Sequence, residues 1–183
     1  MTGPVRILLV CGSLRGGSTN AAVLRTAGSR ALPGIVTVSY EGMATLPHFN
    51  PDDDFDPLPP AVVELRTAIA RADAVLFCTP EYAGALPGSF KNLLDWTVGG
   101  GELDGKPVAW LNVAHQGRGD GAQATLVTVL GYLGAAVVKR ACRRLPVARD
   151  WVGPGGVITD PAWRDAVTDA LAALTTELTA LRT

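Results

Sequence analysis

The feature that most constrains the fold is an alternation of short apolar runs with stretches of helical periodicity. Most of the runs are apolar throughout, as strands buried on both faces of a sheet should be. They predict five strands, at 5–11 (VRILLVC), 35–40 (IVTVSY), 74–79 (AVLFCT), 107–113 (PVAWLNV) and 135–138 (AAVV).

The segments between these runs repeat their apolar residues every three or four positions, which predicts helices. The last helix has the clearest start, since Asp160 is a good N-cap and Pro161 suits the first helical position. The expected buried faces are Val62, Leu65, Ile69 and Ala72; Phe90, Leu93, Leu94 and Val98; Leu126, Val129, Leu130 and Leu133; and Trp163, Val167, Leu171, Leu174, Leu178 and Leu181.

Strands that alternate with helices form right-handed crossovers and a parallel sheet covered on both faces. We therefore predict an α/β fold, a three-layer sandwich whose five-stranded sheet has the order 2-1-3-4-5. A chain of 183 residues fits one domain, which we assign to 1–183. The proline- and aspartate-rich stretch 46–60 is expected to be a long surface loop.

Charge and cysteine usage exclude several classes of protein. The net charge of -1 provides no basic surface for nucleic acid or anionic lipid. The three cysteines are far apart in the sequence and lack a CxxC pair, and no apolar run approaches the length of a membrane span. These features favour a cytoplasmic protein with neither nucleic acid nor membrane as partner.

Three loops follow predicted strands at the edge where such sheets bind ligands. They are 12–20 (GSLRGGSTN), 80–88 (PEYAGALPG) and 115–121 (HQGRGDG). In the order 2-1-3-4-5 the first two face each other across one crevice, and the third forms its wall. A glycine-rich loop before a helix directs backbone N–H groups at an anion, commonly a phosphate.

Two nucleotide motifs are nearly matched and are disfavoured. The first loop has the GxxxxG of a P-loop, but Ser18 stands where the lysine should follow. The stretch 117–122 (GRGDGA) has the spacing of a dinucleotide fingerprint, but no acidic residue follows it until Asp150. A single terminal phosphate is favoured, because Ser13, Arg15 and Ser18 with the N–H groups of Thr19 and Asn20 can surround a dianion without metal.

A metal site is not expected. The two histidines, His48 and His115, have no ligand spacing, and the acidic run 52–54 is typical of a solvated surface. Along the crevice, Pro80, Glu81 and Tyr82 offer main-chain groups, a carboxylate and an aromatic face that suit a flat polar heterocycle.

Two stretches, 12–20 (GSLRGGSTN) and 79–96 (TPEYAGALPGSFKNLLDW), resemble the patterns GSxRxxSxN and PEYxxxxPGxLKNxxDW of the NADPH-dependent FMN reductase family of flavodoxin-like proteins. The resemblance spans most of the chain. It implies non-covalent FMN, hydride accepted from NADPH or NADH, and reduction of quinones, azo dyes, free flavin or metal oxyanions. No side chain is then needed as a catalytic acid or base.

Carried over residue by residue, the resemblance assigns the FMN phosphate to Ser13, Arg15, Ser18 and Asn20, with Thr19 acting through its backbone. It assigns the isoalloxazine ring to Pro80, Glu81, Tyr82 and Ala83, and we add His115, Gln116 and Gly117 to the same pocket. Position 83 is commonly Asn in the family, and the loop after the fourth strand is usually richer in serine and proline.

The sequence thus predicts an FMN-dependent NAD(P)H oxidoreductase with ping-pong kinetics. The resemblance also implies a homodimer or homotetramer, with the 88–98 helix near the interface. The alternatives are a flavodoxin-like electron carrier that never meets nicotinamide and a flavin-binding scaffold protein with incidental turnover.

Overall fold

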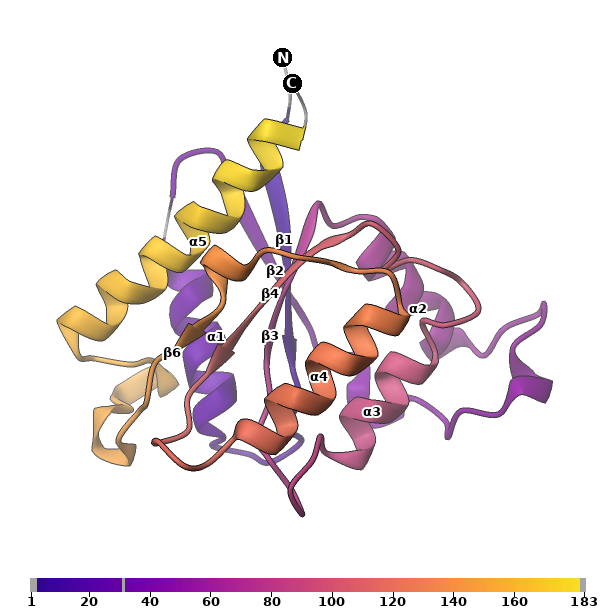
Figure 1. Ribbon diagram of the computed structural model, residues 1–183, viewed down its shortest axis with the longest axis horizontal. Helices are drawn as coiled ribbons and strands as arrows, with labels where there is room; N and C mark the ends of the chain where they lie inside the picture. The colour runs from indigo at the N-terminus through magenta and orange to yellow at the C-terminus, as the bar shows by residue number, and fades with distance from the viewer. Residues whose placement is uncertain (1–2, 31, 182–183) are drawn as a thin grey trace.

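The computed structural model, which describes residues 3–30 and 32–181, has one twisted parallel sheet (Figure 1). Its order, β2-β1-β3-β4-β5, is the predicted one. The strands are β1 (Val5–Cys11), β2 (Ile35–Tyr40), β3 (Ala74–Cys78), β4 (Pro107–Asn112) and β5 (Ala136–Val137).

The edge of the sheet beyond β4 differs from the prediction. The strand expected at 135–138 is reduced to two residues, because the chain turns into a 3-10 helix at Lys139–Ala141. The chain then returns as β6 (Arg143–Arg144), which pairs in parallel with Leu111 and Asn112 at the end of β4. The other 3-10 helices are Gly42–Thr45, Pro51–Asp53, Arg149–Trp151 and Pro154–Gly156.

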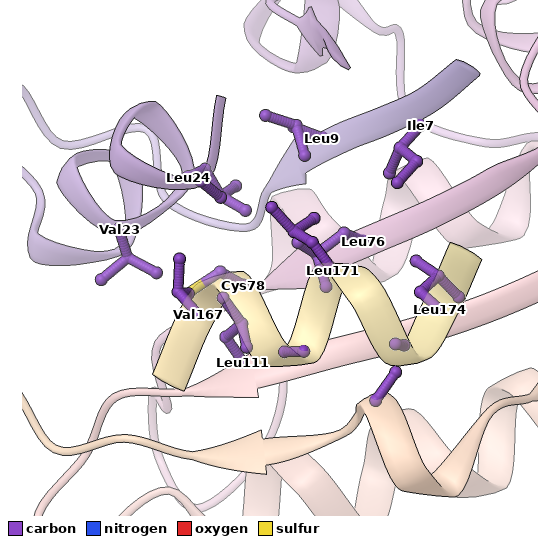
Figure 2. Close-up of a cluster of buried hydrophobic side chains, with 14 of the residues drawn as sticks. Ile7, Leu9, Val23, Leu24, Leu76, Cys78, Leu111, Val167, Leu171 and Leu174 are labelled. Carbon is purple, nitrogen blue, oxygen red and sulfur yellow. The ribbon is translucent and has the colours of Figure 1, made fainter. Parts of the chain in front are cut away.

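Two helices cover one face of the sheet, and three cover the other (Figure 1). On the first face α1 (Thr19–Ser29) and α5 (Pro161–Leu181) bury apolar side chains against β1, β3 and β4. In Figure 2 Val167, Leu171 and Leu174 of α5 point to the strands. Trp163 and Leu178 are also buried, as predicted, while the side chain of Leu181 lies outside the described residues.

The start of α5 is the predicted one. The carboxylate Oδ1 of Asp160 accepts a hydrogen bond from the Trp163 N–H at 2.7 Å, and Pro161 is the first helical residue. This pairing satisfies one of the N–H groups that the helix itself leaves free.

The opposite face carries α2 (Pro60–Ala70), α3 (Gly88–Asp95) and α4 (Asp120–Tyr132). Most of their predicted apolar stripes are buried, while Val129 and Leu133 are partly buried and Val98 is exposed. Helix α3 ends at Asp95, so Val98 leaves the helical register and is 61% exposed.

The first part of the 46–60 loop is held against α3. Asn92 accepts a hydrogen bond from the Phe49 N–H at 2.7 Å and donates one to the Pro47 carbonyl at 2.9 Å. The Trp96 indole N–H donates to the same carbonyl at 2.8 Å, and its ring meets Phe49 edge to face at 5.0 Å. Asn92 and Trp96 of the KNLLDW stretch therefore support the loop.

The acidic run at 52–54 is not all solvated, which corrects the sequence prediction. The Asp54 carboxylate lies 2.6 Å from the Arg66 guanidinium, and both side chains are only 12% exposed. Arg66 also donates to the Trp96 carbonyl at 2.9 Å. This ion pair joins the loop to α2 and to the end of α3.

Candidate functional site

A crevice of about 500 Å³ lies at the carboxyl ends of β1, β3 and β4, where the strand order reverses. The three loops predicted to meet there do meet. Five of the predicted site residues line it, namely Thr19, Asn20, Pro80, Glu81 and His115. The sequence analysis missed the other lining residues, Thr79, Val113, Ala114, Arg118, Gly119 and Val147.

The loop before α1 presents unused backbone donors. Within the described residues, the N–H groups of Gly16, Gly17, Thr19 and Asn20 have no protein acceptor. Gly17 has φ +68, a backbone conformation that costs little only without a side chain. The first turn of α1 contains no acidic residue, so the positive end of the helix dipole is not neutralised locally.

Two buried polar side chains extend this donor set. Ser18 is 3% exposed, and its hydroxyl has no hydrogen-bond partner among the described residues. Asn20 is also buried and accepts a hydrogen bond from the Cys78 thiol at 3.3 Å. Burial raises the pKa of Cys78 well above its ordinary value, so this thiol keeps its proton and can donate it.

Ser13 and Arg15 lie on the other side of this loop. They line a separate hollow of about 340 Å³ between the ends of β1 and β2. The Arg15 guanidinium makes one long contact, 3.4 Å, to the Gly17 carbonyl, and its side chain is exposed. The structure therefore brings the predicted phosphate residues to one loop but distributes them over its two sides.

The 80–88 loop forms a tight hairpin. Tyr82 and Ala85 exchange backbone hydrogen bonds of 3.0 and 3.1 Å, and Ala83 occupies the turn with φ 49. A left-handed backbone suits Asn or Gly better than Ala. The turn therefore gives a backbone reason why asparagine would suit position 83, where this chain has alanine. Tyr82 is 53% exposed, and neither it nor Ala83 lines the crevice.

Glu81 joins two of the loops. Its carboxylate accepts a hydrogen bond from the Ala122 N–H, at the start of α4, at 3.0 Å. The contact is tight, because a Cβ at Gly121 would lie 2.0 Å from the Gly84 carbonyl oxygen. Glu81 thus caps a helix and lines the crevice at the same time.

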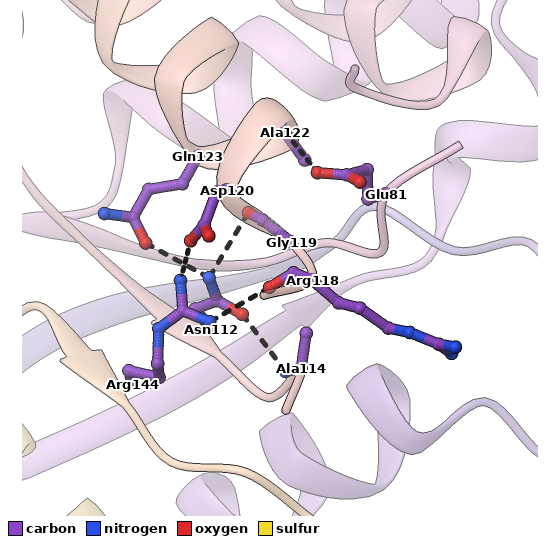
Figure 3. Close-up of polar contacts among 9 residues, drawn as sticks. All are labelled: Glu81, Asn112, Ala114, Arg118, Gly119, Asp120, Ala122, Gln123 and Arg144. Carbon is purple, nitrogen blue, oxygen red and sulfur yellow. Dashed lines mark hydrogen bonds and ion pairs between the residues drawn. The ribbon is translucent and has the colours of Figure 1, made fainter. Parts of the chain in front are cut away.

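A polar network fixes the loop after β4 (Figure 3). Asn112 donates to the Gly119 carbonyl at 3.3 Å and to Gln123 at 3.1 Å, and it accepts from the Ala114 N–H at 3.0 Å. Arg144 of β6 pairs with Asp120 and donates to the Arg118 carbonyl at 2.9 Å.

The dinucleotide motif at 117–122 is therefore explained by the fold. Its helix N-terminus is capped by the Glu81 carboxylate, and its last glycine lies against the Gly84 carbonyl. A pyrophosphate at this helix end would have to displace both contacts.

The remaining residues of this loop lie at the mouth of the crevice. His115, Gln116 and Gly117 are exposed, and only His115 lines the cavity. Arg118 lines it as well, and Figure 3 shows its side chain extending away from Asp120 and Arg144. In the sequence, Arg118 stands in a glycine-rich loop, and nothing in its neighbourhood distinguishes it from an ordinary solvated arginine.

Residues 3–30 and 32–181 contain no group of three or more His, Cys, Asp or Glu side chains arranged to hold a metal ion. Over the same residues, no helix is both long and apolar enough to cross a membrane.

The model of the family described as NADPH-dependent FMN reductase matches residues 5–148. An NAD(P)H-dependent FMN reductase of Pseudomonas aeruginosa is 38% identical over 126 residues, which cover 68% of this chain and 67% of that protein. A quinone reductase of Escherichia coli is 33% identical over 184 residues, covering 94% and 95%.

A solved structure extends the likeness to three dimensions. The flavoenzyme FerB of Paracoccus denitrificans, described as an NAD(P)H:(acceptor) oxidoreductase, superposes with a TM-score of 0.74 at 26% identity. The alignment covers 94% of this chain and 98% of FerB.

Proposed function

The chain belongs to the NADPH-dependent FMN reductase family, and from this premise we propose that its crevice binds FMN and that the enzyme passes reducing equivalents from NAD(P)H to quinones. It is an oxidoreductase that uses FMN, with NAD(P)H as co-substrate. When bound, FMN supplies the hydride chemistry, so that the protein contributes binding and orientation.

The donor set at the start of α1 fits a phosphate. The N–H groups of Thr19 and Asn20 have no protein acceptor, and the hydroxyl of the neighbouring Ser18 has no hydrogen-bond partner among the described residues. Ser13 and the Arg15 guanidinium complete the proposed set from the other side of the loop. These unpaired donors, gathered at one helix start, are the single observation that carries the proposal, because one phosphate can accept hydrogen bonds from all of them.

The ring end is assigned to the two loops that form the rest of the crevice. Pro80, Glu81 and His115 line it. We include Tyr82 and Ala83 from the hairpin above it, with Gln116 and Gly117 at its mouth. Since Glu81 is already bonded to the Ala122 N–H, we propose that it positions the loop as well as bounding the pocket.

The phosphate assignment is tested by comparing FMN with riboflavin. A hydrogen bond to a charged group is worth roughly 1.5 to 3 kcal/mol, so Arg15→Ala should weaken FMN binding about ten- to a hundredfold. Its affinity for riboflavin, which lacks the phosphate, serves as the control and should not change. Equal affinity of the unsubstituted protein for the two flavins would refute the assignment.

Turnover with quinones is proposed to follow ping-pong kinetics. One crevice must admit both the nicotinamide and the acceptor, because the second dinucleotide motif is occupied by protein contacts. Initial rates at several fixed benzoquinone concentrations should give parallel double-reciprocal lines. Intersecting lines would require a ternary complex and contradict this order.

Reduction of the bound flavin by nicotinamide distinguishes the proposed enzyme from an electron carrier. Anaerobic NADPH should bleach the visible flavin bands, whereas a carrier that never meets nicotinamide would keep them.

We also propose a homodimer or homotetramer, with the region of α3 near the interface. Exposed Tyr82 and Val98 lie beside or just beyond this helix and are consistent with that contact. A monomeric mass by light scattering would contradict it.

A further inference from the structure

The hollow between the ends of β1 and β2 has an unusual charge distribution. The charged residues that line its volume of about 340 Å³ are Arg15, Arg25 and Glu41. Among the described residues, neither arginine has a carboxylate within 4.0 Å. With Arg15 assigned to the FMN phosphate, Arg25 and Glu41 remain as a cation and a carboxylate that form no ion pair with each other, so each can bind a different group of one ligand.

Arg25 is exposed, but one hydrogen bond fixes the stem of its guanidinium. It projects from α1, and its Nε donates to the Gly156 carbonyl, 131 residues away in sequence, at 3.1 Å. This bond leaves the terminal guanidinium nitrogens available. A guanidinium with a fixed stem is well suited to bind a phosphate through two parallel hydrogen bonds.

The rest of the lining suits a flat heterocycle. Leu9, Leu24, Met43 and Ala44 provide apolar surface, and Leu14 is 55% exposed although its side chain also lines the hollow. The volume lies at the lower end of the range for small-molecule sites, which is enough for part of a dinucleotide.

The arrangement of elements has a counterpart in dinucleotide-binding folds. There, a glycine-rich loop follows the first strand, an acidic residue at the end of the second strand binds the adenosine ribose, and a nearby arginine accommodates a 2′-phosphate. Here Gly16 and Gly17 follow β1, Glu41 directly follows β2, and Arg25 lies across the same hollow.

We propose that this hollow binds the adenosine 2′-phosphate end of NADPH, with Arg25 on the phosphate and Glu41 on the ribose hydroxyl. The inference rests on the proposed function, because the nicotinamide end must reach the crevice on the other side of the Gly16–Gly17 loop. It makes Arg25 a determinant of specificity for NADPH over NADH, a preference that the sequence left open.

The test measures binding to the FMN-loaded protein by calorimetry, with adenosine 2′,5′-bisphosphate and 5′-AMP as probes. The bisphosphate should bind more tightly, and Arg25→Ala should weaken it about ten- to a hundredfold. Arg71→Ala is the matched control, because Arg71 is exposed at the end of α2 and does not line the hollow. The control should bind both probes as the unsubstituted protein does.

Because Arg25→Ala also removes the contact to Gly156, a second variant introduces repulsion without deleting a contact. Ser39→Asp adds a carboxylate to the lining and should reduce the preference for the bisphosphate, and the ratio of kcat/KM for NADPH over NADH, by at least tenfold. Equal binding of the two probes to the unsubstituted protein, or no loss in either variant, would overturn the inference. If NADH reduces the flavin as efficiently as NADPH does, this site is refuted but the proposed function is not. If neither nucleotide reduces the flavin, the proposed function is refuted.

Discussion

Replacing Gly121 with alanine should separate the two loops that form the wall of the crevice. The added Cβ would lie 2.0 Å from the Gly84 carbonyl oxygen and 3.1 Å from the Glu81 carboxylate. Contacts under 3.0 Å are essentially never found for Cβ atoms, so the two backbones must move apart by at least about 1 Å.

The size of the effect follows from the contacts at stake. The bond from the Ala122 N–H to Glu81 is already 3.0 Å long, and a further 1 Å breaks it. A lost hydrogen bond to a charged group costs about 1.5 to 3 kcal/mol. A displacement of about 1 Å near a reacting centre can lower a rate about a hundredfold. We therefore expect Gly121→Ala to lower both the free energy of unfolding and the kcat/KM for quinone reduction.

A control in the same helix separates the clash from helix propensity. A Cβ at Gly131 meets nothing within 4 Å, so Gly131→Ala should raise the free energy of unfolding by about 0.5 to 1 kcal/mol. Both variants are compared by urea denaturation and by FMN titration of the apoprotein. If Gly121→Ala is stabilised like Gly131→Ala and binds FMN within twofold of the unsubstituted protein, the reasoning is wrong.

Three further predictions concern residues away from this contact. Arg66→Leu leaves the Asp54 carboxylate without its cation, at a site where both side chains are only 12% exposed. Urea denaturation should show the free energy of unfolding lowered by about 3 to 5 kcal/mol. A loss below about 1 kcal/mol would show that water replaces the ion pair. Burial raises the pKa of Tyr40 to about 12 from 10, so the folded protein keeps a proton that the unfolded chain loses. Between pH 10 and 12 the unsubstituted protein should therefore lose about 2 to 3 kcal/mol more stability than Tyr40→Phe, and an equal loss in the two proteins would contradict this assignment. Ala83→Gly should relieve the left-handed turn and raise Tm, whereas Ala85→Gly should lower it; the opposite order would contradict the turn geometry.

The regular part of the fold was predictable because its signals are local. Strands β1 and β2 have the bounds that their apolar runs predicted, and the order follows from the rules for βαβ crossovers. The end of the sheet was not predictable in the same way. Two-residue strands such as β5 and β6 have no periodicity, and β6 (Arg143–Arg144) is a strand only because its backbone pairs with the end of β4.

Some residues of the predicted site could be placed from the sequence, and others could not. Loop positions follow from topology, so the meeting of Thr19, Glu81 and His115 in one crevice was foreseeable. The placement of Ser13 and Arg15 on the far side of their loop was not, because it depends on the path of the backbone through Gly16 and Gly17. The acidic run gave the wrong environment for Asp54, since its partner Arg66 is 12 residues away on another element.

Glu81 shows why a family pattern does not by itself assign a role to each residue. A carboxylate beside a proposed flavin pocket suggests a ligand contact, yet one of its oxygens is bonded to the Ala122 N–H and brings the start of α4 against the 80–88 loop. Asn92 and Trp96 of the same pattern act farther away, on the backbone of the 46–60 loop. The family motif therefore contains residues that position the walls of the pocket as well as residues that line it. Effects on FMN binding must therefore be compared with effects on unfolding before any of these side chains is counted as a ligand contact.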